Sequence, residues 1–433
     1  MSGSPHFSSL VQKCEKSINI LRCLSGVWWG SHPYTQKLWY NAIIRSQLDY
    51  GSFLLNFCNK TNLVNLLKLQ SKCLRIILGA MKSSPINAMQ VECGEPPLDL
   101  RRQFLSDRFL FKLIQNKNHP LTPKLYYLLE LFGNSENKLP CLLHSLRTLI
   151  QLPNLINQFS MNPIYLSPYD ALTLNPNIIL NFVIVKHTPG AHSAFHDNFY
   201  RHFNGWHQFY TDSSKLSPDS CVGVSVWIPS SKITLNYKCP SSATVFTGEA
   251  LAVLEAIIFI KSHNLNNSII FSDSKSCLQS VLSNPFRSTS LSPLILKIRQ
   301  NLLECHQLNI KVVLAWIPGH SGIPGNVNAD SCARLAIQNG TLEHFQTYSQ
   351  DLCLLAKSLQ NKSWTVAWKA SKLIKGKYYA DVQSDVPSSP CFFRSCKADK
   401  RTVSTICRLR LGHSCTPVFL SKLRIISLRM RTG

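Results

Sequence analysis

Short apolar runs alternate with polar positions most regularly between residues 205 and 340. The runs in "WHQFYTDSSK", "CVGVSVWIPSSKITLNYKCP", "SIIFSDSKS" and "IKVVLAWIPG" predict five strands, the second and third joined by a turn near Pro229. A strongly apolar helix is predicted over "ATVFTGEALAVLEAIIFIKSH", and further helices over residues 274–284, 291–306 and 324–338. This order predicts one five-stranded mixed sheet with flanking helices, an α/β (α+β mixed) domain of ordinary size over residues 205–340.

The segments on either side have different patterns. Residues 1–130 are predicted to be helical, since "NKTNLVNLLKLQSKCLRIILGA" places leucines and isoleucines near helical spacing. Residues 131–204 are rich in Asn, Pro, Ser and His without clear periodicity, which predicts an extended linker. Residues 341–433 are predicted to form a basic tail. We expect the N-terminal helices to be only marginally stable by themselves.

The charge of the chain is strongly and unevenly positive. Its 433 residues carry a formal net charge of +24. Residues 1–204 contain 20 Lys and Arg against 10 Asp and Glu, residues 205–340 contain 10 against 7, and residues 341–433 contain 16 against 5. The flanks therefore provide most of the positive field, which predicts contact with a nucleic-acid backbone.

Two further features bear on where the chain works. Its 16 cysteines are scattered, and "MSGSPHFSSLVQKCEKS" lacks the apolar core of a secretory signal. This favours reduced thiols and an intracellular location, in the cytoplasm or nucleus. No uninterrupted apolar run reaches about 18 residues, so neither a membrane span nor a membrane partner is expected.

Single acidic residues occur in four of the predicted elements. Asp212 lies in the first strand, Glu249 near the start of the long helix, and Asp273 at the end of the fourth strand. Asp330 lies in the last helix, and His320 precedes it in the Gly- and Pro-rich stretch "AWIPGHSGIPGNVNAD". Burying unpaired carboxylates together is unfavourable through repulsion and desolvation, and a divalent cation removes that cost.

Each of these residues alone has a structural alternative. Asp212 suits a turn, Glu249 complements a helix dipole, and Asp273 suits an N-cap. Asp330 suits a solvent-facing helical position, and His320 suits an ordinary loop. Coincidence explains the joint pattern poorly, because the order of the elements and the loop chemistry agree.

The acidic cluster suits Mg²⁺, which binds hard oxygen ligands and keeps several waters. Two such ions about 3.5–4 Å apart can clamp a phosphodiester, one activating water and the other stabilising the leaving oxygen. His320 is suited to proton transfer or product departure, because histidine titrates near working pH. We expect two Mg²⁺ ions as cofactors, with Mn²⁺ as a substitute.

Residues 206–340 resemble the ribonuclease H domain. The resemblance is carried by "YTDSSK", "TGEALAVLEAI", "IIFSDSKSCLQSV" and "WIPGHSGIPGNVNADSCARLA". It implies endonucleolytic cleavage of the RNA strand of an RNA–DNA hybrid, leaving a 3′-hydroxyl, with His320 supporting turnover. Ser213 departs from the family, which often has Gly there. The metal ligands that the resemblance implies are Asp212, Glu249, Asp273 and Asp330.

Nucleic-acid contacts are expected at the phosphates and the 2′-hydroxyls of the hybrid, read by shape and not by base sequence. Lys215 and Lys275 are the candidates nearest to the acids. The aromatic residues Trp28, Trp29, Trp39 and Tyr40 could stack on bases, although aromatics at helical spacing more often belong to a core.

The flanks resemble a more particular family. "LWYNAIIRSQLDYGS", "LQSKCLRIILGAMKSSPINAMQVECGEPPLDLRR" and "ICRLRLGHSCTPVFLSKL" are similar to the C-terminal part of a non-LTR retrotransposon reverse-transcriptase polyprotein of the jockey type. This resemblance implies that residues 1–130 are a remnant of the thumb and connecting helices. No Asp-Asp pair occurs in the chain, so we expect a truncated element without a polymerase active site. An intact reverse transcriptase acting in trans is then a possible partner.

A zinc site in the tail is a weaker hypothesis. Its candidate ligands have spacings that match no common closed zinc site. These candidates are Cys391, Cys396, Cys407, His413 and Cys415.

Two functional hypotheses from different classes therefore remain. The first is a metal-dependent ribonuclease H. The second is a catalytically inactive nucleic-acid binder that keeps the same scaffold while the basic flanks bind.

Overall fold

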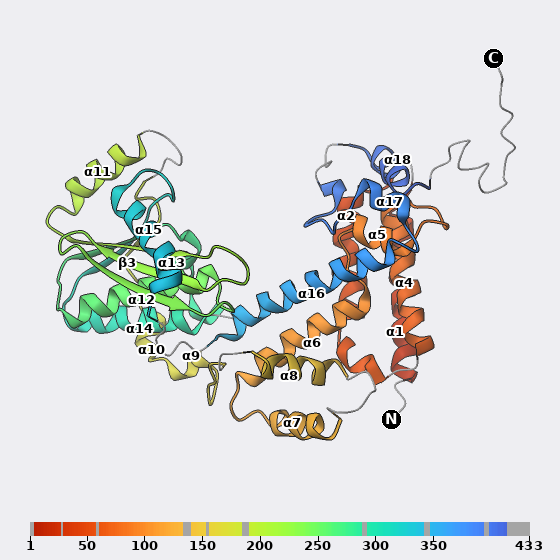
Figure 1. Cartoon of the computed structure of the whole chain (residues 1–433), viewed down its shortest axis with the longest axis horizontal. Helices are drawn as coiled ribbons and strands as arrows, with labels where there is room; N and C mark the ends of the chain where they lie inside the picture. The colour runs from red at the N-terminus through yellow and green to blue at the C-terminus, as the bar shows by residue number, and fades with distance from the viewer. Residues whose placement is uncertain are drawn as a thin grey trace, which may run out of the picture. The chain divides into compact units, whose positions relative to one another are not determined.

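The computed structural model describes residues 4–26, 29–57, 60–132, 140–152, 156–183, 190–287, 292–341, 347–393 and 398–413 (Figure 1). The chain divides into two compact units. Unit 1 consists of residues 1–110, 125–148 and 356–433, and unit 2 of residues 111–124 and 149–355, each in its described part. Described residues from the first and the last parts of the chain therefore both belong to unit 1, and unit 2 is formed by the middle.

Unit 2 is built on a mixed sheet of six strands. Four strands run parallel in the order β1-β6-β5-β2, and β3 and β4 extend the sheet as antiparallel neighbours of β2. The α/β class is as predicted, with one strand more than expected. The strands are β1 (Ile178–Ile179), β2 (His207–Ser214), β3 (Val222–Ile228), β4 (Ile233–Cys239), β5 (Ser268–Ser272) and β6 (Val312–Trp316).

Helices cover both faces of this sheet. One face packs on α12, α13 and α14 through a core that includes Phe209 and Ile270. The other face packs on α11 and α15 through an aromatic core that includes Phe195, Tyr210 and Phe271. The helices are α9 (Pro163–Leu166), α10 (Tyr169–Thr173), α11 (Ala191–His202), α12 (Val245–Ser262), α13 (Lys275–Leu282), α14 (Pro293–Gln307) and α15 (Pro324–Asn339), with a 3₁₀ turn η3 at Pro285–Arg287.

Close packing of α15 on β3 depends on a glycine. A Cβ atom at Gly223 would come within 2.0 Å of the backbone oxygen of Ala333, so any larger residue would push the helix away. The position of α15 matters because this helix carries Asp330.

Residues 131–204, predicted as an extended linker, contain ordered elements in their described part. The strand β1 pairs with β6, and α11 buries Phe195 and Phe199 against the sheet. The buried Arg299 of α14 donates hydrogen bonds to the backbone oxygens of Ala171, Leu172 and Leu174. Short elements of this kind are stabilised by the domain on which they pack, so local periodicity alone did not reveal them.

Unit 1 is helical. Its first part contains a π-helical turn η1 between α2 and α3 and a 3₁₀ turn η2 before α4, and its last part contains a 3₁₀ turn η4 before α18. The elements are α1 (Ser4–Cys23), α2 (Pro33–Trp39), η1 (Tyr40–Arg45), α3 (Ser46–Asp49), η2 (Ser52–Phe57), α4 (Lys60–Leu78), α5 (Ile86–Glu92), α6 (Leu98–Ile114), α7 (Leu121–Phe132), α8 (Cys141–Ile150), α16 (Ser349–Ser371), α17 (Lys377–Val382), η4 (Cys391–Phe393) and α18 (Lys400–Arg410). The helices α6, α7, α8 and α16 each also include residues that are assigned to unit 2.

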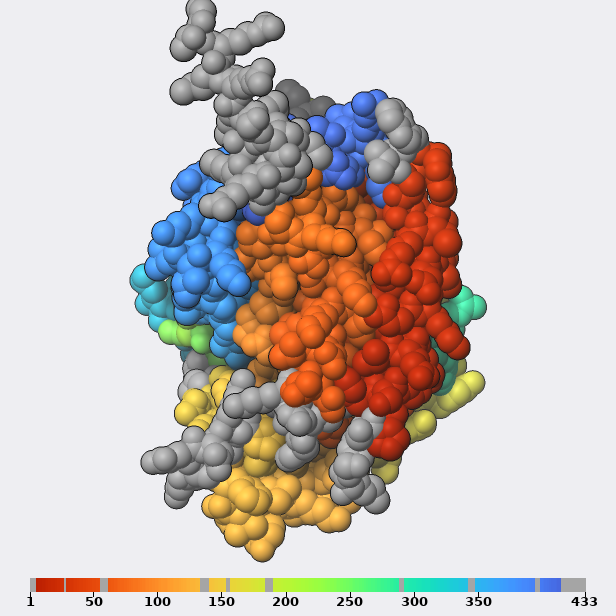
Figure 2. All heavy atoms as spheres, turned by 90° about the vertical axis from the view of Figure 1, so that its right-hand side faces the viewer, coloured from red at the N-terminus to blue at the C-terminus, as the bar shows by residue number. Residues whose placement is uncertain are grey.

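The N-terminal helices and the segment predicted as a basic tail share one core. Trp368, Tyr379 and Cys407 are buried together with Tyr40 and Leu74 from the first part of the chain. The same segments lie side by side on the surface of unit 1, with the N-terminal residues in red and orange and the C-terminal helices in blue (Figure 2). Residues 341–413 are therefore largely helical where described, and residues 414–433 lie outside the described residues.

A buried ion cluster lies within unit 1. The fully buried carboxylate of Glu95 accepts hydrogen bonds from Lys37, from Arg45 at 3.2 Å and from the Tyr40 hydroxyl at 3.3 Å. These basic groups hold the pKa of Glu95 below its usual range, although burial by itself raises it. Tyr40, a candidate for base stacking from the sequence, is thus a core residue, while Trp29 and Trp39 are exposed and Trp28 lies outside the described residues.

No helix in the described ranges has both the length and the apolar character needed to cross a lipid bilayer. Every cysteine that the structure describes carries a free thiol.

Candidate active site

Two of the predicted acids come together through the register of two parallel strands. The strands β2 and β5 are neighbours, and Thr211 of β2 lies opposite Ser272 of β5. Asp212 is the next residue of β2, and Asp273 directly follows the end of β5, so the two carboxylates emerge side by side at the carboxyl end of the parallel pair. This edge is where ligands usually bind in sheets with parallel strands.

The third acid approaches from the helix that covers β2. Thr244 caps α12 by accepting a hydrogen bond from the backbone N–H of Thr247, and Glu249 follows at the second turn. The Oε1 atom of Glu249 accepts hydrogen bonds from the backbone N–H of Ser213 at 3.1 Å and from the Ser213 hydroxyl at 3.0 Å. A Cβ atom at position 248 would lie 2.7 Å from the Cβ of Ser213, so Gly248 provides the room for this serine.

The three carboxylates form a compact group that suits a hard divalent cation. Oxygen atoms of Asp212, Glu249 and Asp273 all lie within 4.8 Å of one another. Glu249 Oε2 is buried and has no hydrogen-bond partner in the structure. An unpartnered carboxylate oxygen facing two further carboxylates is costly without a counter-ion, and three oxygen donors match the preference of Mg²⁺.

Burial, and after it the proximity of the acids, raises their pKa values. Burial, followed by the charge of Asp273, raises the pKa of Asp212 to about 7. Burial and the charge of Asp212 raise the pKa of Glu249 well above its usual value. Burial also raises the pKa of Asp273, against an opposing effect of the Asn326 side chain and His320. Each carboxylate is therefore harder to ionise than in water. A bound cation would reverse this effect, because its positive charge favours the ionised carboxylates.

The fourth acid lies nearby on α15, outside the compact group. Its charge contributes to the raised pKa of both Asp212 and Asp273. Asp330 is also held by Arg334, which donates through Nε at 3.1 Å and Nη2 at 2.9 Å from the next turn of the helix. Asp330 therefore influences the ionisation of the other acids through its charge. Its own carboxylate is paired with Arg334 of the same helix.

His320 lies in the loop between β6 and α15. It is exposed and has a positive φ of 51°. The loop backbone passes close to the acids, because a Cβ at Gly319 would come within 2.7 Å of Asp273 Oδ2. A glycine before the histidine therefore allows this loop to contact the carboxylate.

The two lysines singled out in the sequence occupy different environments. Lys215 donates hydrogen bonds to the backbone oxygens of Ser241 at 2.7 Å and Ala243 at 2.9 Å, which ties the end of β2 to the segment before α12. Lys275 is exposed at the start of α13, with its amine 4.9 Å from the centre of the Trp316 ring. Lys275 is thus the better placed of the two to reach a phosphate.

Comparison with known proteins now bears on this geometry. Residues 206–338 match the family model described as RNase H. These residues form a ribonuclease H domain. The match covers the sheet from β2 to β6 together with α12 and most of α15, and therefore every element that carries one of the acids.

Two curated relatives show a weak similarity in the same domain. Ribonuclease H1 of Mus musculus is 28% identical over 138 residues, and ribonuclease H1 of Rattus norvegicus is 28% identical over 138 residues. Each alignment covers 29% of this chain and 48% of the relative. The chain thus spans about half the length of the curated relatives it matches.

The structure adds two residues to the candidate site. Asn326 lies one turn before Asp330 on the same face of α15, and its side chain interacts with Asp273. Ser213, which in the sequence is only a departure from glycine, holds Glu249. The i,i+4 spacing of Asn326 and Asp330 in "GNVNAD" could have indicated the role of Asn326. No local signal could have indicated the role of Ser213, because Ser213 and Glu249 are 36 positions apart.

Proposed function

We propose that the ribonuclease H domain hydrolyses the RNA strand of RNA–DNA hybrids in a reaction that requires divalent metal ions. The convergence of Asp212, Glu249 and Asp273 from two strands and a helix supports this proposal most directly. A group of two buried carboxylates and one half-buried carboxylate, with an unpartnered oxygen, weakens the fold unless it binds a cation. The match of residues 206–338 to the ribonuclease H family supports a nucleic-acid substrate.

The proposed metal ligands are Asp212, Glu249 and Asp273, with Asp330 as the fourth acid at the edge of the group. Mg²⁺ or Mn²⁺, when bound there, would lower the pKa of a metal-bound water and stabilise negative charge on the phosphodiester. Ser213 fixes the direction of the Glu249 carboxylate through its hydroxyl and its backbone N–H. The side chain of Asn326 interacts with the Asp273 carboxylate from α15 and helps to orient it.

We propose that His320 moves a proton at the leaving oxygen and helps the product depart. The exposed position of His320 and the closeness of its loop to Asp273 support this role. We assign Lys275 to contact with a phosphate of the hybrid, because its amine is exposed beside the candidate site. Lys215 instead has a structural role in this proposal, since its amine is engaged by two backbone oxygens.

The test is cleavage of a labelled RNA–DNA hybrid by the full chain, with Mg²⁺ or with EDTA. We expect the RNA strand alone to be cut in Mg²⁺, and Asp273→Asn to abolish cutting while the variant still binds the hybrid. Asp197→Asn removes a charge from the exposed face of α11 and serves as the matched control. Tight binding without cutting under any divalent metal would instead indicate an inactive nucleic-acid binder.

We also propose that the whole chain belongs to a reverse-transcriptase polyprotein of a jockey-type non-LTR retrotransposon, with unit 1 corresponding to its thumb and connecting helices. The sequence resemblance in α2 to α6 and in α18 supports this, as does the shared core of these segments. The chain should then co-elute with an active reverse transcriptase of such an element on a primer–template. Failure to co-elute, with hybrid cleavage intact, would contradict the partnership and leave the ribonuclease proposal standing.

A further inference from the structure

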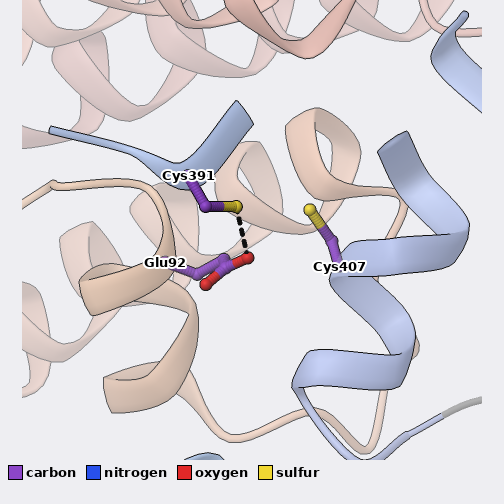
Figure 3. Close-up of side chains that lie close together, drawn as sticks. All are labelled: Glu92, Cys391 and Cys407. Atoms are coloured by element: carbon purple, nitrogen blue, oxygen red, sulfur yellow. Dashed lines mark hydrogen bonds between the residues drawn. The ribbon is translucent and has the colours of Figure 1, made fainter. Parts of the chain in front are cut away.

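Unit 1 contains a second group of metal-binding side chains, separate from the acidic group of the ribonuclease H domain. Glu92 is the last residue of α5, Cys391 is the first residue of η4, and Cys407 lies within α18. A carboxylate oxygen and the two sulfurs all lie within 4.8 Å of one another. Figure 3 shows the two sulfurs pointing toward one another, with the carboxylate of Glu92 beside them.

The sequence hypothesis of a zinc site in the tail is only partly met by this group. Cys391 and Cys407 belong to it, but the imidazole of His413 is hydrogen-bonded to the Ser83 hydroxyl at 2.9 Å. Cys396 and Cys415 lie outside the described residues. The third donor, Glu92, comes from the opposite end of the chain, so no spacing within the tail could have indicated it.

The carboxylate of Glu92 is fixed in direction by its other neighbours. Tyr379 donates its hydroxyl to Oε2 at 2.6 Å, and Arg410 donates Nε to Oε1 at 2.9 Å. Carboxylates that bind metals are usually oriented by outer hydrogen bonds of this kind. The side chain of Glu92 is only 1% exposed, so these contacts form in a nearly dry environment.

A hydrogen bond joins two of the three donors. The Cys391 thiol donates to Glu92 Oε1 at 2.7 Å, the interaction drawn as a dashed line in Figure 3. Replacing the thiol protons with one divalent ion would let the same atoms face a common positive centre. Two thiolates and one carboxylate would then balance the charges of a divalent ion and the Arg410 guanidinium.

From this geometry we propose that Glu92, Cys391 and Cys407 form a site for Zn²⁺ or a similar thiophilic divalent ion. Two sulfur donors and one carboxylate favour zinc over Mg²⁺, which prefers oxygen ligands. The ion would enter past Cys391, which is half-buried, since Glu92 and Cys407 are buried. Binding breaks two S–H bonds, forms two metal–sulfur bonds and releases two protons to solvent.

Such a site would hold the first and last parts of unit 1 together. Glu92 and Cys391 are 299 positions apart, and Arg410 reaches Glu92 from 318 positions away. An ion that binds the folded arrangement and not the unfolded chain raises the stability of unit 1 with increasing ion concentration. The role that the structure assigns to this site is therefore structural, and it does not depend on the proposed ribonuclease activity.

The first experiment uses the unaltered full chain, reduced with a phosphine and stripped of metal. Titration with Co²⁺ should produce a thiolate-to-cobalt charge-transfer band that saturates at one equivalent, and Zn²⁺ should displace it. Alkylation followed by peptide mass spectrometry should show that Zn²⁺ protects Cys391 and Cys407. Absence of the band, or protection of other cysteines in their place, would overturn the proposal, and this result does not depend on any variant folding.

Variants then assign the ligands. Cys391→Ser and Cys407→Ser should each weaken Zn²⁺ binding at least about tenfold, since each removes one thiolate ligand. Cys23→Ser, at an exposed cysteine of α1, should leave the affinity unchanged. Asp273→Asn should also leave the cobalt band intact, which separates this site from the acidic group. Equal affinity in all variants, or a Cys391–Cys407 disulfide that persists under reductant without metal, would contradict the proposal.

Discussion

Removing one carboxylate from the acidic group should stabilise the metal-free protein while abolishing its activity. The perturbation is Asp212→Asn, which keeps the size of the side chain and removes its charge. In the metal-free fold, burial and the charge of Asp273 raise the pKa of Asp212 to about 7. The folded state therefore favours the protonated form of Asp212. Ionisation of Asp212 lowers the stability of the wild-type protein, whereas the uncharged asparagine of the variant has no such penalty.

The magnitude follows from the pKa of Asp212. The value rises from 3.8 to about 7, and since one pKa unit is worth about 1.4 kcal/mol, the rise corresponds to about 4 kcal/mol. Local relaxation and entry of water reduce such penalties in proteins, so we expect a gain of about 1–3 kcal/mol for Asp212→Asn at about pH 8. The wild-type penalty grows as the pH rises from the unfolded pKa and is complete above the folded pKa. At about pH 4 Asp212 is protonated in the folded wild-type protein, and the difference in stability between wild type and Asp212→Asn should nearly vanish.

The assay is thermal unfolding of the full chain in EDTA at both pH values, following the transition of unit 2. A gain of about 1–3 kcal/mol corresponds to a rise of roughly 2–12 °C in its midpoint. Asp197→Asn should show no comparable gain, and Mg²⁺ should stabilise the wild-type protein more than Asp212→Asn. A variant less stable than wild type at about pH 8 without metal would refute the reasoning, because burial of the Asp212 charge beside Asp273 would then not limit the stability of the metal-free fold.

Three further outcomes are expected. Ser213→Ala removes the hydroxyl that holds Glu249 and should raise the Mg²⁺ concentration for half-maximal cleavage by about 10–100-fold; an unchanged metal titration would argue against a positioning role. His320→Ala should lower single-turnover or product-release rates by about 10²-fold or more with little change in hybrid affinity, and an equal loss of binding would contradict proton transfer. Glu95→Gln should destabilise unit 1 by about 3–5 kcal/mol in denaturant while hybrid cleavage by folded unit 2 persists, because Lys37 and Arg45 would lose the buried carboxylate they share.

The ribonuclease H domain was largely predictable because its signals are local and repeated. The strand "VVLAW" and the centre of "SIIFS" are continuous apolar runs, as expected for strands buried on both faces. The predicted helices over 274–284, 291–306 and 324–338 agree closely with α13, α14 and α15. The strand β1 was not predictable in the same way, because two residues, Ile178–Ile179, become a strand only through pairing with β6.

The predicted linker contains a local pattern that is too weak to indicate a packed helix by itself. In α11, Phe195 and Phe199 are four residues apart and face the same core. That spacing is helical, but a single amphipathic helix among residues rich in Asn and Pro does not indicate what it packs against. The shared core of α4, α17 and α18 was beyond any local pattern, because it joins residues from opposite ends of the chain.

The candidate site, too, was determined partly by the sequence and partly by the tertiary structure. The sequence by itself determined which side chains are available: one acid in each of four elements, a histidine in a Gly- and Pro-rich loop, and 16 cysteines. The tertiary structure alone decided which of them meet. The register of β2 and β5 joins Asp212 to Asp273, Arg334 holds Asp330 at the edge of the group, and folding of unit 1 brings Glu92 to Cys391 and Cys407. Periodicity depends on neighbours a few positions apart, whereas these contacts depend on the packing of segments that are distant along the chain.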